Sequence, residues 1–418
     1  MPTNRVFYGW WVVIGFAIMV FISTGVRFTV GPFLKPVVGE LGIDRASFSL
    51  VVAMGLFLYG AFMPLIGRLV DRLGARPVLV SGCVLLSASM AATGLVTRLW
   101  HFALLYGVLL ALGLAATGHV VASAVITRWF VRRRATALSL LGGASMAGMS
   151  LLVPVVMWLI LTLGWRWTYG VIGAVLLAVM LPITLWVVRE SPEVMGLTPD
   201  GSREAGAVAA VTAERTTVSC AMQSVPFWQL AGGLFTCGFS MSLLSAHGVP
   251  MLTDHGYQPM VASWTLGLLG GTAIGFSLIL GVMADRFGRR LMLAWIYGAR
   301  AAAFAGLFLV RDHPTAILMI AALGGMTMGG TMALASALSA DVFGRFSVAS
   351  VLGTIFLVHQ TGAALGSWLG GFLFEATGGY GAVFALACTI LSCGAVLSLT
   401  IDERARVLPR LSPVAGGR

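Results

Sequence analysis

Five ionisable side chains lie inside long apolar stretches of the sequence, where a charge is costly and therefore marks a candidate functional site. They are Arg27, His119, His247, Arg300 and His359. An Arg guanidinium presents a planar fork of donors that pairs with a carboxylate through two hydrogen bonds. A His donates to an anion or carries a proton near neutral pH. These residue types predict a site that binds an organic anion.

Arg27 is the preferred carboxylate ligand, because it lies in the first apolar stretch and its guanidinium can face a central cavity. Gln360 follows His359 in a stretch rich in Gly and Ala and adds amide donors. Each candidate also has a structural alternative. Arg27 can extend to the membrane surface, and the His side chains and Arg300 can form hydrogen bonds between helices.

The acidic residues support an anionic cargo. All 15 Asp and Glu residues fall outside the middle of every apolar stretch. An exporter of organic cations and a proton relay built on carboxylates both need a buried acid, so the sequence argues against both. A buried positive charge is instead neutralised by an anionic substrate. A coupled proton would then travel on a His or on the substrate itself.

The elements that position these residues are apolar stretches long enough to cross a bilayer of about 30 Å. The chain has 418 residues, of which 58% are hydrophobic and 10% charged, and this composition excludes a water-soluble protein. We therefore expect an all-α membrane protein with twelve transmembrane helices. The expected spans are 9–34, 47–69, 78–97, 102–126, 136–163, 166–188, 227–252, 259–284, 291–310, 314–338, 346–372 and 380–401.

The expected organisation is a six-helix half over residues 1–188, a central cytoplasmic loop over 189–225, and a second six-helix half with a tail over 226–418. With both termini in the cytoplasm, 19 of the 26 basic residues lie on the cytoplasmic side and five on the other. We expect a multi-pass protein of the cytoplasmic (inner) membrane. The net charge of +11 reflects this bias, and we expect no nucleic-acid partner.

Two loops carry the same pattern, G-x-x-x-D-R-x-G-x-R, at equivalent places in the two halves. The Gly residues permit close approach and a sharp turn, the Asp accepts hydrogen bonds, and the Arg residues remain in water. We expect the two loops to act as a conformational latch on the inner face. Its residues are Gly67, Asp71, Arg72, Gly74 and Arg76 in the first loop and Gly281, Asp285, Arg286, Gly288 and Arg290 in the second.

This repeated loop resembles the signature of the major facilitator superfamily, and the resemblance covers the whole chain. It implies the major facilitator fold, in which two six-helix pseudo-repeats enclose a central site and rock about it in alternating access.

A narrower resemblance is to the monocarboxylate and oxalate/formate porter branch. It rests on the segments 8–13, 25–28, 31–36, 128–134 and 247–250. It implies a small organic anion as cargo. Members of that branch often carry an Arg in the eighth helix that pairs with the substrate carboxylate, and that place falls at about Ser277 here.

The sequence therefore predicts a secondary active transporter, acting as a monomer in the lipid bilayer, that moves a small organic anion, with monocarboxylates first. Ser277 favours one alternative, a larger neutral or anionic metabolite or drug as cargo. A membrane sensor that does not transport is a further alternative. We find no catalytic residues, no metal-ligand spacing and no cofactor motif, so we expect neither an enzyme nor a bound cofactor.

Overall fold

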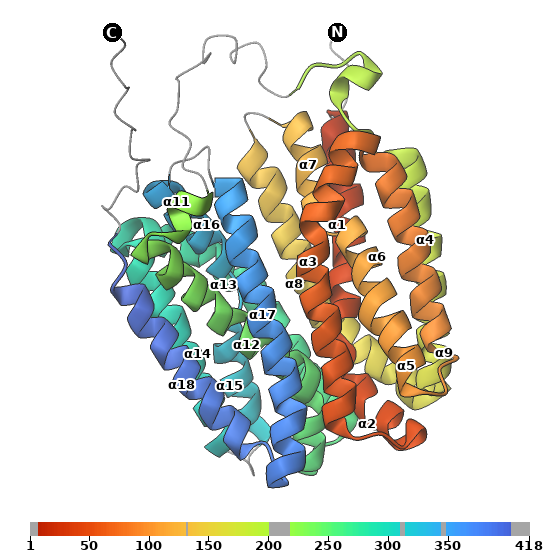
Figure 1. Ribbon diagram of the computed structural model, residues 1–418, viewed down its shortest axis with the longest axis vertical. Helices are drawn as coiled ribbons and strands as arrows, with labels where there is room; N and C mark the ends of the chain where they lie inside the picture. The colour runs from red at the N-terminus through yellow and green to blue at the C-terminus, as the bar shows by residue number, and fades with distance from the viewer. Residues whose placement is uncertain (1–6, 131–132, 200–217, 310–313, 344–347, 403–418) are drawn as a thin grey trace, which may run out of the picture.

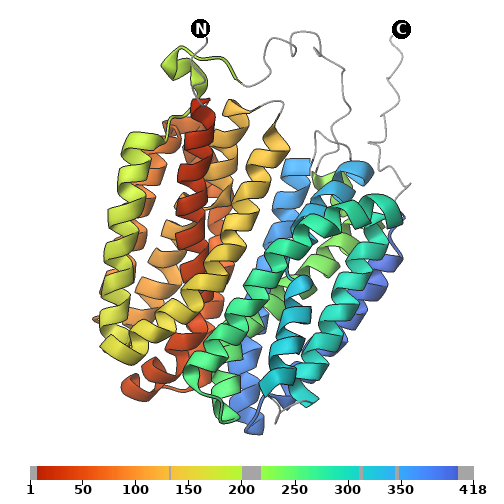
Figure 2. The same ribbon diagram turned by 180° about the vertical axis from the view of Figure 1, so that it is seen from behind.

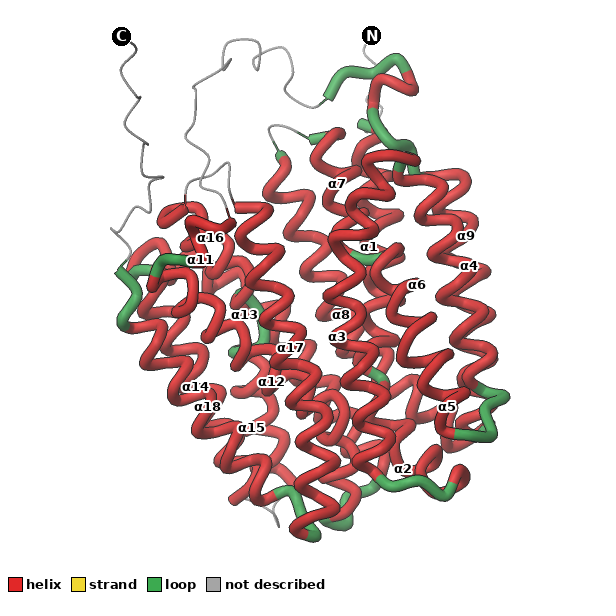
Figure 3. Tube along the Cα trace, viewed as in Figure 1, coloured by secondary structure: helices red, strands yellow, loops and turns green. Residues whose placement is uncertain are grey.

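A computed structural model describes residues 7–130, 133–199, 218–309, 314–343 and 348–402 of the chain. In these ranges the protein is helical, with short connections and no strand (Figure 3). The helices of the first half are α1 Tyr8–Phe28, α2 Val30–Leu41, α3 Arg45–Leu73, α4 Ala75–Thr93, α5 Leu99–Phe102, α6 Leu110–Thr117, α7 His119–Trp129, α8 Arg134–Leu163 and α9 Trp165–Pro182. A π-helical segment, Ala103–Leu109, joins α5 to α6, another, Ile183–Val187, follows α9, and a 3₁₀ turn covers Pro192–Met195.

The second half begins with a short helix that precedes its first long helix. The helices of this half are α11 Val218–Met222, α12 Val225–Asp254, α13 Pro259–Phe287, α14 Arg289–Leu309, α15 Pro314–Met326, α16 Thr331–Phe343, α17 Val348–Thr377 and α18 Gly381–Leu399. Ten helical segments of the described chain are long and apolar enough to cross a membrane. The remaining two expected spans are also helical, since they correspond to α14 with 21 residues and α17 with 30.

Two helical bundles lie side by side (Figures 1 and 2). In the first, α1 packs on α8, and α4 packs on α6 and α9. In the second, α12 packs on α17, α13 on α15, and α14 on α18. Each bundle has its own apolar core. The bundles meet along two seams, where α3 lies against α17 and α8 against α13.

The structure differs from the expected spans in three places. The first span, expected over 9–34, bends at Thr29 and continues as α2 to Leu41. The spans expected as continuous helices over 102–126 and 314–338 are each interrupted, at Gly118 and at residues 327–330. Gly118 has an extended backbone, with φ −86° and ψ −167°, which ends the helix. In both halves, therefore, the fourth span consists of two helical segments.

The connection between the fifth and sixth spans is a single residue. α8 ends at Leu163 and α9 begins at Trp165. Gly164 between them has φ 80°, a conformation that favours glycine because it has no Cβ. This turn keeps α8 and α9 antiparallel neighbours and leaves the opposite face of α8 free to pack against α1 and α13.

Candidate functional site

A cavity of about 960 Å³ lies between the two bundles. Its walls come from α1, α3, α6, α7 and α8 on one side and from α12, α13, α16 and α17 on the other. Its lining residues reach from the middle of the bundles to the first turns of α8. These turns lie at the end of the molecule where α1 begins (Figure 2). The position of the cavity between two halves fits a site that can be reached from one membrane face at a time.

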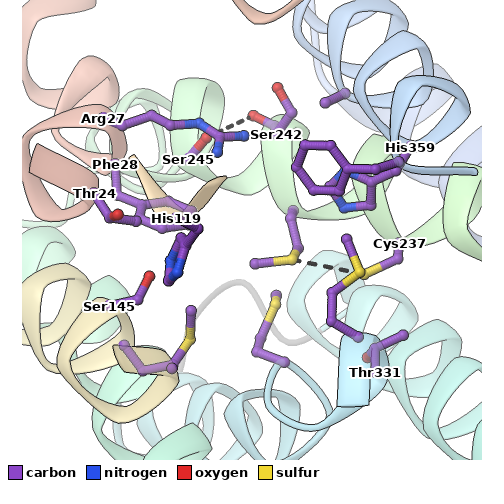
Figure 4. Close-up of a pocket in the computed structure, with 18 of the residues that line it drawn as sticks. Thr24, Arg27, Phe28, His119, Ser145, Cys237, Ser242, Ser245, Thr331 and His359 are labelled. Atoms are coloured by element: carbon purple, nitrogen blue, oxygen red, sulfur yellow. Dashed lines mark hydrogen bonds between the residues drawn. The ribbon is translucent and has the colours of Figure 1, made fainter. Parts of the chain in front are cut away.

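Arg27 lines this cavity from the last turn of α1 (Figure 4). Its Nη2 donates to Gln360 Oε1 at 3.4 Å, and its guanidinium lies 4.9 Å from the centre of the Tyr59 ring. Among the described residues that line the cavity there is no Asp or Glu. The guanidinium therefore faces the cavity with neutral partners, and an anion entering there would meet an uncompensated positive charge.

Gln360 joins the two bundles beside Arg27. Its side chain is fully buried, and its Nε2 donates to Leu56 O of α3 at 3.2 Å. The same amide oxygen that accepts from Arg27 lies 3.0 Å from His359 Nδ1. Gln360 thus orients both Arg27 and His359 at the α3–α17 seam.

His359 and His119 line the cavity from opposite bundles. The His359 ring stacks on Phe356, with 5.3 Å between ring centroids. His119 is the first residue of α7, directly after the interruption at Gly118. Both predicted positions therefore face the same space as Arg27, and their contact with a substrate stays a prediction.

The structure places His247 away from the cavity. Its side chain is buried, with Nε2 at 2.9 Å from Ser367 O and 3.2 Å from Ser49 Oγ. Its Nδ1 lies 3.4 Å from the hydroxyl of Tyr380. Ser49 belongs to α3 of the first bundle and Ser367 to α17 of the second. In this conformation His247 joins the bundles and does not line the cavity.

Arg300 is fully buried in α14 and is also absent from the cavity wall. Its Nε donates to Thr327 Oγ1 at 3.2 Å, and its Nη2 donates to Thr327 O. Its Nη1 lies 3.2 Å from Ser240 Oγ and 3.3 Å from Cys237 Sγ. Arg300 therefore supports the interruption between α15 and α16 from behind the wall.

A group of charged and polar residues joins the two bundles at the end of the molecule opposite to the start of α1. Arg45 places Nη1 at 2.6 Å and Nη2 at 3.2 Å from the carboxylate of Asp254, and Lys35 Nζ lies 2.7 Å from the same carboxylate. Arg45 also donates from its backbone to Glu375 and from Nη1 to the hydroxyl of Tyr380, both at 3.0 Å. We call these five residues the Arg45 cluster. It ties α2 and α3 of the first bundle to three segments of the second.

The latch residues lie at the other end. In the first loop, Asp71 and Arg72 are exposed. The backbone N–H of Arg76 donates to Glu190 at 3.1 Å, and its guanidinium donates to Leu185 O. These contacts are made inside the first bundle, so the loop holds α4 to the segment that follows α9.

The second loop begins in the last turns of α13. Gly288 turns the chain with φ 91°, and Arg286 is exposed. Arg290 Nη1 donates to Ile401 O at 3.4 Å. Gly281 lies within α13, and the side chain of Asp285 is outside the described part of the structure. A latch between the loops stays a prediction.

Sequence reasoning missed several residues of the cavity wall. Ser242 and Ser245 of α12 lie near Arg27 in Figure 4, and Thr331 lies at the first position of α16. The hydroxyls of Ser242 and Thr331 are buried and have no hydrogen-bond partner among the described residues. Ser277, at the place expected for a basic group, also lines the cavity. Small polar residues in apolar spans were the available signal, but their spacing does not reveal which ones share a cavity.

The chain matches the model of the Major Facilitator Superfamily over residues 16–311 and 230–416. It belongs to this superfamily and is a multi-pass membrane transporter of that kind.

Curated relatives span most of the chain. It is 27% identical over 386 residues to the uncharacterized MFS-type transporter YcxA of Bacillus subtilis (strain 168), covering 88% of each protein. It is 27% identical over 405 residues to monocarboxylate transporter 13 of Rattus norvegicus, covering 95% of this chain and 89% of the other.

A solved structure has the same fold. A bacterial homolog to the human lysosomal transporter Spinster, in an inward-facing and unoccupied conformation, superposes with a TM-score of 0.68 at 18% identity. The match covers 95% of this chain and 94% of that one.

Proposed function

We propose that this transporter moves a small organic anion whose carboxylate lies against Arg27. One observation carries the proposal: a guanidinium lines the central cavity, and no Asp or Glu is among the described lining residues. Burying a cation without a counter-ion is unfavourable. An anionic cargo would therefore be stabilised by pairing with the guanidinium of Arg27, which has no counter-ion in the described part of the chain. The unpartnered hydroxyl of Ser242 adds a donor close to the same group.

Monocarboxylates are the first class to test. The relative from Rattus norvegicus, a monocarboxylate transporter by name, supports this choice, as does the resemblance of the first span to that branch. Ser277 favours a second candidate, a larger neutral or anionic metabolite or drug. It replaces the expected basic group of the eighth span, and the cavity volume leaves room for such a cargo.

The mechanism we propose is alternating access. In this mechanism the Arg45 cluster closes one end of the cavity. The cavity opens at the other end, where the first turns of α8 line it. The excess of basic residues between spans favours the cytoplasmic (inner) membrane with both termini in the cytoplasm. In that orientation the described conformation faces inward, and the Asp-Arg loops would join when the inner end closes.

A coupled proton has two possible carriers in this arrangement. His119 and His359 line the cavity, and an imidazole ring nitrogen can take up a proton from a substrate and release it again. The carboxylate of the cargo can instead enter in its protonated form. Uptake into liposomes with and without an imposed pH gradient, with His359→Asn and His119→Asn, separates the two.

The proposal is tested by the thermal stability of the purified protein with a panel of small carboxylates. A ligand that binds only the folded state stabilises it by about 2.7 kcal/mol at a hundredfold excess over its Kd. We expect a carboxylate to raise the Tm of the wild type and of Arg98→Gln, and not of Arg27→Gln. Arg98 is exposed at the closed end and provides the same change of charge outside the cavity. Equal Tm shifts in all three proteins would refute the role of Arg27.

A further inference from the structure

The interruption of the tenth span exposes the start of a helix to the cavity. Gly330 has φ 79° and turns the chain into α16. The first helical bond of α16 is from Leu334 N to Gly330 O at 2.9 Å, so the N–H groups of its first turn have no acceptor within the helix. These N–H groups belong to Thr331, Met332 and Ala333, and all three residues line the cavity.

The buried hydroxyl of Thr331 is a second indication of a ligand site at the start of α16. It is 2% exposed, and its Oγ1 has no hydrogen-bond partner among the described residues. Buried hydroxyls in folded proteins almost always have a partner, and an orphan calls for an explanation. A bound group with oxygen acceptors would pair with this hydroxyl and with the free amides beside it.

The charge around α16 is positive. The N-terminus of a helix carries about half a positive charge, and half-helix N-termini at the midplane of transporters face anionic groups. Arg300 adds a full charge behind it through its two bonds to Thr327. In the described part of the chain no carboxylate forms an ion pair with Arg300. An anion at the N-terminus of α16 would therefore neutralise both the partial charge of the helix and the charge of Arg300.

Figure 4 shows Arg27 and His119 on one side of the cavity and Thr331 with Cys237 on the other. We propose that the N-terminus of α16 is a second anion subsite, so that the preferred cargo carries a carboxylate at each end. This inference rests on the proposed function and narrows it from monocarboxylates to dicarboxylates. One carboxylate lies against Arg27 of the first bundle and the other against Thr331 of the second.

Cargo of this kind touches both halves at once. A monocarboxylate would satisfy only the Arg27 side and leave Thr331 and the first turn of α16 unpaired. The two anionic ends also explain why each bundle brings its own Arg, with the half-buried Arg27 at the wall and the buried Arg300 behind it. The equivalent positions of α7 and α16 in the two halves support this, since His119 begins the corresponding half-helix of the first bundle.

The experiment compares unbranched dicarboxylates of four to eight carbons with monocarboxylates of the same length, by ligand-induced Tm shift at pH 7.5. We expect at least one dicarboxylate to bind about tenfold more tightly than its matched monocarboxylate. Thr331→Val should remove most of this preference and leave monocarboxylate affinity unchanged. Thr331→Ser, which keeps the hydroxyl, should retain it.

The matched control is Thr236→Val in α12. Thr236 is also buried, does not line the cavity, and its hydroxyl already donates to Gly233 O at 2.8 Å. Equal affinities of every matched pair for the wild type would overturn the second subsite, even if Thr331→Val did not fold. A monocarboxylate response that depends on Arg27 would then leave the proposed function standing. No response to either class of acid would end both proposals.

Discussion

Neutralising Asp254 should open the closed end of the cavity. Asp254→Asn keeps the size of the side chain but removes the charge that binds Arg45 and Lys35. The Arg45 side chain is 16% exposed and that of Asp254 26%, so this pair is partly shielded from water. Hydrogen bonds to charged groups contribute about 1.5–3 kcal/mol. The Lys35 pair adds little, because that side chain is 38% exposed.

We take the loss as about 2 kcal/mol, which changes an equilibrium constant about 30-fold. The bond exists only while this end is closed, so its loss shifts the balance toward the conformation that is open there. If that conformation is populated at about 1% in the wild type, the variant should populate it at about a quarter.

Distances between spin labels would measure the shift. Arg98 and Gln258 are exposed on opposite bundles at the closed end, and both are suitable for labelling after replacement by Cys. Cys220, Cys388 and Cys393 are not buried and need to be replaced by Ser first. A second, longer distance should appear in Asp254→Asn.

Lys35→Gln is the control, and it should change the distances little because that pair is solvent-screened. An unchanged distance distribution in Asp254→Asn would contradict the reasoning, since it would mean that the Arg45 cluster does not hold this end closed.

Three further predictions concern binding and stability. Arg27→Lys should weaken carboxylate binding about tenfold, because the charge remains but the two-pronged donor is lost; titration of Tm against ligand measures it, and unchanged affinity would count against a bidentate contact. Asp44→Ala should cost about 0.5–2 kcal/mol, because its carboxylate accepts from Ser47 N at 2.6 Å and caps α3; Asp44→Asn should recover most of the Tm. Hydrogen bonds from Arg166 and then Trp165 lower the pKa of Glu40 below its usual 4.5, so its contribution to stability is complete above that value and is lost as pH falls through the lowered pKa. The Tm difference between wild type and Glu40→Gln should therefore be present at neutral pH and shrink in acid.

The membrane fold could be predicted from the sequence because its signals are long and repeated. A bilayer admits few alternatives to apolar helices of about 20 residues. The repeated Asp-Arg loops then placed the two halves in register. The same reasoning singles out Arg27, His119 and His359, which line the cavity, because an ionisable residue inside an apolar span stands out in the sequence whatever its orientation.

The interruptions of the fourth and tenth spans could not be predicted in the same way. A single Gly such as Gly118 is tolerated in a helix, and the pair Gly329 and Gly330 fits a helix-packing face equally well. Only the surroundings of these residues decide between a packed helix and a break. The cavity wall at Thr331 depends on that decision and was missed for this reason.

Contacts between the halves were also beyond the sequence. His247 pairs with Ser49, 198 positions away, and Arg27 with Gln360, 333 positions away. The depth of a residue in its span does not tell which side of the helix it occupies. The sequence therefore groups His247 and Arg300 with the cavity residues, although the structure buries both outside the cavity wall.

The most direct test of the central claim is counterflow in proteoliposomes loaded with an unlabelled carboxylate and exposed to the same acid in radiolabelled form. Counterflow needs no knowledge of the coupling ion or of the direction of transport. We predict transient accumulation of label with the wild type and with Arg98→Gln, and none with Arg27→Gln. Accumulation by Arg27→Gln equal to that of the wild type would contradict the account, and so would a wild type that exchanges no mono- or dicarboxylate.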